Sequence, residues 1–285
     1  MFRQKTIKKE CSISGIGVHS GEMARVVLRP AVKDHGITIV SSLALEEVIC
    51  LGRVIPEEAK HATVLRQGEA IVSTIEHLMA AISVFGIDNL EIFLEGTEVP
   101  ILDGSAVPFV QMLEEVGIEE QECKKVFLFP KSVLEFRDKD GRVIKIEPPR
   151  KGEEHRLFFD YGVDFEHPLA GSGHLEGEFT KEYFINHIAP SRTFGFLAQL
   201  SILRKYGLAK GASLGNTVVI GEDEILNDLR FEDEFVRHKL LDFIGDLACL
   251  GKTLTGRLRA RKTGHNFNKK VVEHFILHPE QWMLL

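Results

Sequence analysis

Residues 234–251 read EFVRHKLLDFIGDLACLG and are the stretch of sequence that is most informative about the fold. On an α-helix, side chains four residues apart lie on one face, so His238, Asp242 and Asp246 would form a single polar stripe. The remaining positions are mostly apolar, which is typical of a helix inside a core. Three titratable side chains on so apolar a helix are costly to bury unless they serve a common purpose. The stretch therefore predicts a buried helix that carries a functional site.

A shorter stretch in the first half, residues 73–86 with the sequence STIEHLMAAISVFG, has the same order of features. In each stretch a histidine, His77 or His238, leads into an apolar helix that ends at a glycine. Each helix then precedes an expected strand, over residues 89–94 or 256–261. This order predicts a duplicated α+β unit with helices packed between two sheets and a site that draws on both halves. Chance is the alternative, because helix, glycine and strand often follow one another.

Further short elements are expected on either side of these helices. Strands are expected at residues 6–13, 24–28, 37–40, 126–129, 132–136 and 143–146, and helices at residues 107–116 and 234–250. The polar run 119–125 separates the halves, so we expect an N-terminal α+β domain over residues 1–122 and a C-terminal one over residues 123–285. The stretch 161–210 has no counterpart in the first half. We interpret it as an insertion that shapes a binding site.

The composition is that of an ordinary globular protein and excludes several functional classes. The chain has 285 residues and a net charge of −7, whereas a nucleic-acid surface requires an excess of Lys and Arg. The N-terminus lacks the apolar segment of a secretory signal, and no run approaches the roughly 20 apolar residues of a membrane-spanning helix. The four cysteines form no CxxC pair, which is typical of reduced thiols in a reducing compartment. We therefore expect a soluble, cytoplasmic protein.

The polar stripe on the second helix has the residue types of a metal site. A His and an Asp four residues apart, here His238 and Asp242, can bind one ion through nitrogen and oxygen, a ligand set that suits zinc. A catalytic zinc usually has three protein ligands and one open position, and His77 is the candidate for the third. An ion pair on a helix surface is the alternative for an HxxxD pair taken alone. The matching histidine in the other half favours the metal.

Two more titratable residues are candidates for proton transfer at this site. Glu76 directly precedes His77, so its carboxylate would lie near the metal and could accept a proton from water. His265 follows the strand expected at 256–261 and would come within reach of Asp246. An Asp–His pair holds an imidazolium that can protonate a leaving amine. The alternatives are a solvated helix carboxylate for Glu76 and an ordinary polar loop residue for His265.

Three polar loops are of the kind that bind ligands: residues 15–21, 101–105 and 207–214. The glycine spacing in the first loop does not match the GxGxxG pattern of dinucleotide-binding proteins. Within the second loop, Asp103, Gly104 and Ser105 are interpreted as a turn and a helix N-cap before the helix expected at residue 107.

Together these motifs resemble the UDP-3-O-acyl-N-acetylglucosamine deacetylases, which commit lipid A synthesis in Gram-negative bacteria. The similarity covers nearly the whole chain in the same order. It comprises GIGVHSG at residues 15–21, STIEHL at 73–78, VPILDGSA at 99–106, SRTFGF at 191–196, RFEDEFVRHKLLDFIGDL at 230–247 and KTGHN at 262–266. Several long motifs in order are much more specific than any one of them.

The resemblance implies a zinc amidohydrolase with an α+β fold. Two similar domains would form a β-α-α-β sandwich, with an insertion in each domain. It assigns the zinc ligands to His77, His238 and Asp242, although Fe²⁺ could occupy the same N/O site. Glu76 would be the general base, and His265, oriented by Asp246, the general acid. Thr193 would help to hold the oxyanion, and the enzyme is expected to be a monomer.

The resemblance also implies contacts with the substrate, UDP-3-O-acyl-N-acetylglucosamine. The acyl chain would enter a passage built by the second-domain insertion, with Phe194 near its mouth. Lys239 and Lys262 are candidates for binding the diphosphate, and His19 resembles a substrate-contacting residue. Two departures are small: Ser20 replaces a commoner Thr, and Ala212 replaces a usual Gly. The alternatives are a zinc deacetylase of another acylated amino sugar and a catalytically silent ligand-binding relative.

Overall fold

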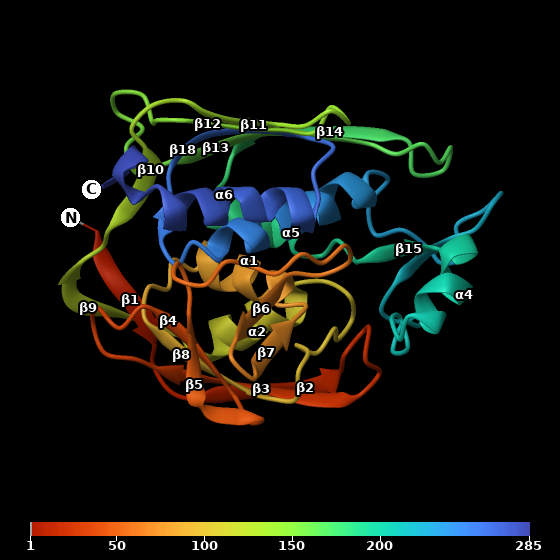
Figure 1. The fold of residues 1–285 in the computed structure, drawn as a ribbon, viewed down its shortest axis with the longest axis horizontal. Coiled ribbons are helices and arrows are strands. Elements are labelled where there is room, and N and C mark those ends of the chain that lie inside the picture. Colours follow the sequence, from red (N-terminus) through yellow and green to blue (C-terminus); the bar gives the residue numbers. More distant parts are fainter. Residues whose placement is uncertain (1) are drawn as a thin grey trace.

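The structure, a computed structural model that describes residues 2–285, contains two five-stranded sheets with helices between them (Figure 1). One sheet has the order β2 (Cys11–Ile16), β3 (Met23–Pro30), β8 (Leu90–Glu95), β4 (Ile37–Ser41) and β5 (Ala44–Cys50). The other has the order β11 (Leu134–Arg137), β12 (Val143–Glu147), β18 (Gly256–Arg261), β13 (Leu157–Asp164) and β14 (Ser172–Glu178). In both sheets the third and fourth strands pair in parallel and all other neighbours pair antiparallel.

The central layer consists of helices from both halves. Helices α1 (Glu76–Val84) and α5 (Glu234–Ala248) pack against each other, with α2 (Val107–Val116) against α1 and α6 (His265–Leu277) against α5. Strand β8, the next after α1, and strand β18, which follows α5 after the short strand β17, each take the third place in their sheet. This shared arrangement confirms the prediction of an α+β sandwich with two similar halves.

Smaller elements surround the sandwich. They are the ribbon of β1 (Arg3–Ile7) and β9 (Ile118–Lys124), the hairpin of β6 (Val64–Gln67) and β7 (Ala70–Ser73), and a sheet of β17 (Thr253–Leu254), β10 (Phe127–Pro130) and β19 (Trp282–Leu284). Between β14 and α5 lie α3 (Lys181–Tyr183), a π-helical turn (Phe184–Ile188), β15 (Phe194–Phe196), α4 (Leu197–Lys205) and β16 (Val218–Ile220), and a 3₁₀ turn (Pro279–Gln281) precedes β19. In Figure 1, β15 and α4 project from one end of the sandwich.

The core lies between the two sheets because each sheet turns one apolar face toward the helices. Along β12 the side chains alternate, and Ile144 and Ile146 are fully buried. Helix α1 is buried almost throughout, as expected for a helix covered on all sides. Within residues 2–285, no helix combines the length and the apolar character needed to cross a bilayer. All four cysteines are free; three are half-buried, and only Cys249 is fully buried.

Several elements differ from the expectations. The single strand expected over residues 6–13 is two strands, β1 and β2, separated by an exposed polar turn. The polar run 119–125, expected to be a connection, forms most of β9, which tolerates polar residues because it belongs to a two-stranded ribbon with exposed side chains. His265 starts helix α6 and does not lie in a loop. That helix escaped prediction because two asparagines and adjacent valines lower its helix propensity.

The expected domain limits fall inside strands. The boundary between residues 122 and 123 lies in β9, which pairs with β1. Residues 161–164, the start of the expected insertion, belong to β13 in the second sheet. The domain boundary and the limits of the insertion therefore stay predictions.

Gly245 sets the distance between the two central helices. A Cβ atom on Gly245 would overlap the carbonyl oxygen of Glu76, so the backbone of α1 lies directly against α5 at this point. Any side chain larger than hydrogen would force the helices apart. The spacing of the polar residues on the two helices thus depends on this glycine.

We expect Gly245→Ala to destabilise the protein by about 1–3 kcal/mol, the usual cost of overpacking a core. On the exposed face of a helix, replacing Gly with Ala would stabilise the protein by about 1 kcal/mol. The sign of the change in the free energy of unfolding therefore distinguishes a helix contact at Gly245 from an effect of helix propensity. The measurement is the free energy of unfolding in urea. Gly215→Ala is the control, because a Cβ there meets only ordinary van der Waals contact. Stability equal to or above that of the wild type would show that the helices do not touch at Gly245.

Candidate metal centre and active site

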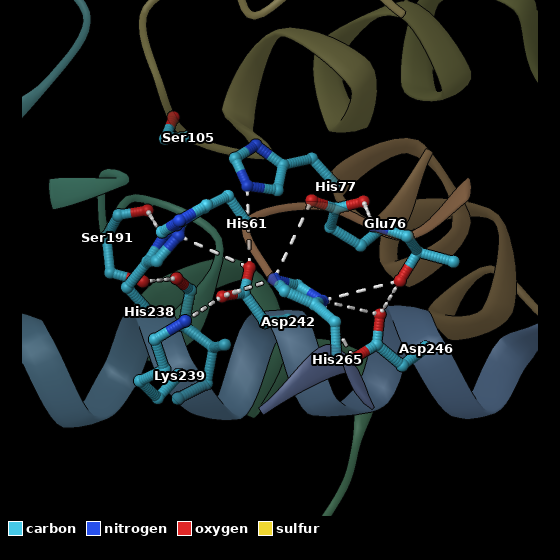
Figure 2. Close-up of polar contacts among 12 residues, drawn as sticks. His61, Glu76, His77, Ser105, Ser191, His238, Lys239, Asp242, Asp246 and His265 are labelled. Carbon is cyan, nitrogen blue, oxygen red and sulfur yellow. Dashed lines mark hydrogen bonds and ion pairs between the residues drawn. The ribbon is translucent and has the colours of Figure 1, made fainter. Parts of the chain in front are cut away.

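Residues far apart in the sequence meet in the buried layer between the sheets (Figure 2). Glu76 and His77 are the first residues of α1, and His238 and Asp242 lie one turn apart on α5. His265 is the first residue of α6. All five side chains are buried. The two halves therefore each supply part of one cluster.

Three donor atoms of this cluster converge. The Nε2 atoms of His77 and His238 lie 3.5 and 3.2 Å from Oδ1 of Asp242. This oxygen is buried, and no residue in the described chain donates a hydrogen bond of good geometry to it. Such a buried, unsatisfied carboxylate oxygen beside two imidazole nitrogens is costly unless a cation binds there. The donor set of two nitrogens and one oxygen fits a divalent transition metal, zinc in particular.

The surroundings favour the protonation states that metal ligands need. Nδ1 of His238 lies 3.2 Å from the carbonyl oxygen of Ser191, a contact that leaves Nε2 with its lone pair free. Burial lowers the pKa of His77, so its ring is neutral. Burial alone would raise the pKa of Asp242, but His238 and Lys239 outweigh it and hold the pKa well below its usual value. Deprotonated ligands of this kind are ready to bind a cation.

Glu76 lies beside the donor atoms, and one oxygen of its carboxylate lies within 4.8 Å of ligand atoms of Asp242 and His265. Its Oε2 accepts a hydrogen bond from the backbone nitrogen of Thr63 at 3.0 Å, and its Oε1 lies 4.0 Å from Nε2 of His265. Burial raises the pKa of this carboxyl to about 7, against the opposing effect of His265. A carboxylate with a pKa near neutrality is suited to take up and release a proton.

His265, unlike Glu76, is held in its charged form. Its Nδ1 lies 3.0 Å from Oδ2 of Asp246, and its Nε2 lies 3.7 Å from Oδ2 of Asp242. Burial lowers the pKa of His265, but the carboxylates around it, Asp246 first, raise it to about 9. The ring is therefore an imidazolium at neutral pH and points a proton toward the donor cluster. The predicted proximity of His265 and Asp246 is present in the structure.

A cavity of about 490 Å³ opens onto these residues. Its inner end is polar and is lined by Glu76, His77, His238, Asp242 and His265. The rest is mostly apolar and comes from the region of β15, α4 and β16, with Leu197, Leu200, Leu203 and Val219 among the lining residues. A ligand in this cavity would place a polar group at the buried cluster and an apolar group between the leucines.

Of the residues predicted to contact the substrate, all but one line this cavity. Thr193, Phe194, His19 and Lys239 line the cavity. The Phe194 ring lies 6.1 Å from the His238 ring, and the Lys239 ammonium donates to Oδ2 of Asp242 at 2.6 Å. Lys262 does not line the cavity, and its ammonium pairs with Asp164 at 2.6 Å. The structure therefore brings the first four together near the donor cluster and leaves Lys262 apart.

Sequence reasoning missed the residues that hold the functional side chains. Thr63 bonds to both Glu76 and Asp246, and Asn268 donates to Oδ2 of Asp246 at 2.7 Å. Asn268 lies three residues after His265, a spacing that would have indicated a shared face had α6 been predicted. Thr63 gave no sequence signal.

A further missed residue, Glu98, holds the loop that carries His19. Its buried carboxylate accepts hydrogen bonds from the backbone nitrogens of His19 and Ser20 at 2.9 and 2.8 Å, and from Oγ1 of Thr74 at 3.0 Å. His61 also lines the cavity, and its carbonyl oxygen lies 3.2 Å from Nε2 of His19.

Replacing Asp246 with Asn should lower the pKa of His265 by roughly 1–3 pH units, because the variant loses the charge that offsets burial. The measurement is a histidine-selective NMR titration of the protein stripped of metal with a chelator. Asn268→Ala is the control, since it removes a hydrogen bond to Asp246 and keeps the carboxylate. A His265 pKa unchanged in Asp246→Asn would mean that Asp246 does not hold the imidazolium.

Comparison with known proteins identifies the family of the chain. The sequence model of the UDP-3-O-acyl N-acetylglycosamine deacetylase family matches residues 4–276. Two relatives, both named UDP-3-O-acyl-N-acetylglucosamine deacetylase, are from Syntrophotalea carbinolica and Nautilia profundicola. The first is 43% identical over 100% of this chain and 91% of its own length, and the second is 42% identical over 96% and 92%. A relative of the same name from Campylobacter fetus is 42% identical over 95% and 90%. The chain belongs to the UDP-3-O-acyl-N-acetylglucosamine deacetylase family.

Proposed function

We propose that the protein hydrolyses the N-acetyl group of UDP-3-O-acyl-N-acetylglucosamine with the help of zinc, giving acetate and the free amine, the committed step of lipid A biosynthesis. The observation that carries this proposal is the donor cluster of His77, His238 and Asp242, with Glu76 and His265 beside it at the end of an apolar cavity. The family names of the relatives indicate the same substrate.

The three donors would hold the zinc ion through two Nε2 atoms and one carboxylate oxygen. A zinc ion bound there supplies Lewis acidity, which polarises the amide carbonyl and makes water more acidic. Lys239 stabilises the second oxygen of Asp242, so that the carboxylate stays ionised and correctly oriented. The carbonyl oxygen of Ser191 orients His238 in the same way.

The proton transfers fall to the two remaining residues. Glu76 accepts the proton that water loses as it attacks the carbonyl carbon of the acetamide. Thr193, at the cavity wall, is the proposed donor to the oxyanion that forms. His265, charged through its contact with Asp246, then donates its Nε2 proton to the leaving nitrogen as the C–N bond breaks. The products are acetate and an amine that takes up the proton of the new carboxyl group, and the proton held by Glu76 passes to His265 and restores its charge.

The cavity supports an acylated substrate. Its leucine-rich portion suits a hydrocarbon chain, and Phe194 lies between that portion and the metal ligands, 4.8 Å from the Phe235 ring. His19 is a proposed contact for the sugar or nucleotide. Lys239 and Lys262 stay proposed contacts for the diphosphate, although both ammonium groups already face carboxylates.

The metal identity, compartment and assembly state are part of the proposal. The N/O donor set fits both Zn²⁺ and Fe²⁺; zinc is favoured by the higher general affinity of such sites for it, and supply in the cell decides between the two ions. Four free thiols support a reducing compartment, the cytoplasm. We propose a monomer, which light scattering of the purified protein tests.

The experiment that tests the proposal is deacetylation of UDP-3-O-acyl-N-acetylglucosamine by chelator-stripped protein, with and without one equivalent of zinc. We expect turnover to be absent without metal and to return with zinc.

Glu76→Gln should keep stoichiometric zinc and lower kcat by about 10²–10⁴-fold, because it keeps the shape of the side chain and loses the base. If the protein bound zinc but hydrolysed UDP-3-O-acyl-N-acetylglucosamine of no acyl-chain length, the substrate would have to be another acylated amino sugar. Full activity of Glu76→Gln would remove Glu76 from the mechanism.

The pH dependence of kcat/KM should be bell-shaped. The rate requires an ionised Glu76 and a protonated His265, whose pKa values in the protein alone are about 7 and about 9. Activity therefore rises as pH increases toward 7 and falls above 9. Bound zinc lowers the pKa values of both Glu76 and His265, because a nearby cation favours the less positive form of each group. Asp246→Asn should move chiefly the alkaline limb, toward lower pH, because Asp246 is the main group that raises the pKa of His265 and only a lesser cause of the raised pKa of Glu76. A profile without an alkaline limb would contradict the role of His265.

A further inference from the structure

The region around α4 has an unusual charge composition. Between Phe194 and Ile220 the sequence contains Arg204, Lys205 and Lys210 and no acidic residue, although the chain as a whole carries a net charge of −7. An acidic run at residues 222–224 follows directly and limits the local excess of positive charge. A local cationic surface on an anionic protein is a sign of an anionic partner.

The same region exposes large apolar side chains. The exposed fractions of Leu197, Ile202, Tyr206 and Leu214 are 45%, 54%, 81% and 54%. Helix α4 has no buried residue, and Figure 1 shows that it projects beyond the sheets at one end of the molecule. We call these four apolar residues, together with Arg204, Lys205 and Lys210, the insertion tip. A helix this exposed is expected to carry few apolar residues unless another surface covers it.

The insertion tip is continuous with the cavity of the metal centre. Leu197 and Leu214 are exposed and also line the cavity, and Leu200 and Leu203 of α4 line it farther in. The other end of the cavity is formed by His77 and His238. A continuous apolar surface thus leads from the outside of α4 to the metal ligands.

We propose that the insertion tip docks on the surface of an anionic phospholipid bilayer. Ile202 and Tyr206 enter the boundary between headgroups and acyl chains, and the three basic side chains contact the anionic headgroups. Charges of one sign favour this occupant over a second copy of the chain, because a symmetric dimer through the insertion tip would bring the basic side chains of both copies together. Docking would open the apolar cavity toward the lipid phase, where an acylated sugar partitions. The inference goes beyond the deacetylation proposal and does not depend on it.

The test is co-sedimentation of the full chain with vesicles of phosphatidylcholine alone or mixed with phosphatidylglycerol, without any substrate. We expect binding to the mixed vesicles, weaker binding to phosphatidylcholine and a decrease with added salt. Arg204→Glu with Lys205→Glu should weaken binding to mixed vesicles by at least about fivefold for each charge. Ile202→Asp with Tyr206→Asp should weaken binding to both kinds of vesicle.

The matched control is Leu43→Asp with Leu45→Asp, because these leucines are 65% and 64% exposed and lie in the first half, outside the insertion tip. None of the substituted residues lines the cavity, so zinc binding and thermal unfolding verify that each variant is folded. Equal vesicle binding by the control and by the insertion-tip variants would overturn the proposal. So would absence of binding to mixed vesicles at low salt, or a dimer in light scattering that the insertion-tip substitutions abolish.

Discussion

Where α1 passes α5, the backbone of Glu76 lies against Gly245 so closely that no side chain fits between them. This contact sets the distance between the chemical groups on α1 and those on α5. His77 follows Glu76 directly, and Asp242 and Asp246 lie on either side of Gly245 on α5. Because both helices are rigid and buried, a single close approach positions ligands from two halves of the chain.

In this layer, burial disfavours the charged form of a titratable side chain and neighbouring opposite charges favour it. The balance of the two effects differs between residues. Glu76 has one distant cationic neighbour, so burial dominates and raises its pKa. Asp242 has a close ammonium group and histidines, so its charge survives burial. His265 is surrounded by carboxylates and remains charged for the same reason. Side chains that are all buried therefore differ in charge: Glu76 has a pKa near neutrality, Asp242 is an ionised carboxylate and His265 is an imidazolium.

Much of the fold and of the site could be predicted from the sequence. The repeated order of histidine, apolar helix, glycine and strand indicated the two matching sheets, because those features follow local periodicity. The spacing of His238, Asp242 and Asp246 indicated one helix face. Helix α6 could not be predicted, since its helical state depends on packing against α5 and not on propensity.

The supporting contacts escaped prediction for a related reason. Thr63 reaches Asp246 across a sequence separation of 183 residues, and no local pattern records such a contact. Motif similarity suggested Lys262 as a ligand contact, but motif similarity does not describe the ion pair with Asp164 that takes up its ammonium group. Local patterns thus located the groups proposed to react, and only the three-dimensional structure located those that hold them.

The division of the ligand set between two like-folded halves links metal occupancy to the stability of their interface. A cation bound to His77 from one half and to Asp242 from the other has affinity only for the docked arrangement. By mass action, the free energy of binding then adds to that of docking, and whatever loosens the interface also weakens the hold on the ion. The ion would act in effect as a reversible cross-link between the two halves, added to the packing and to hydrogen bonds such as that from Thr63 to Asp246 that hold the apo protein together there.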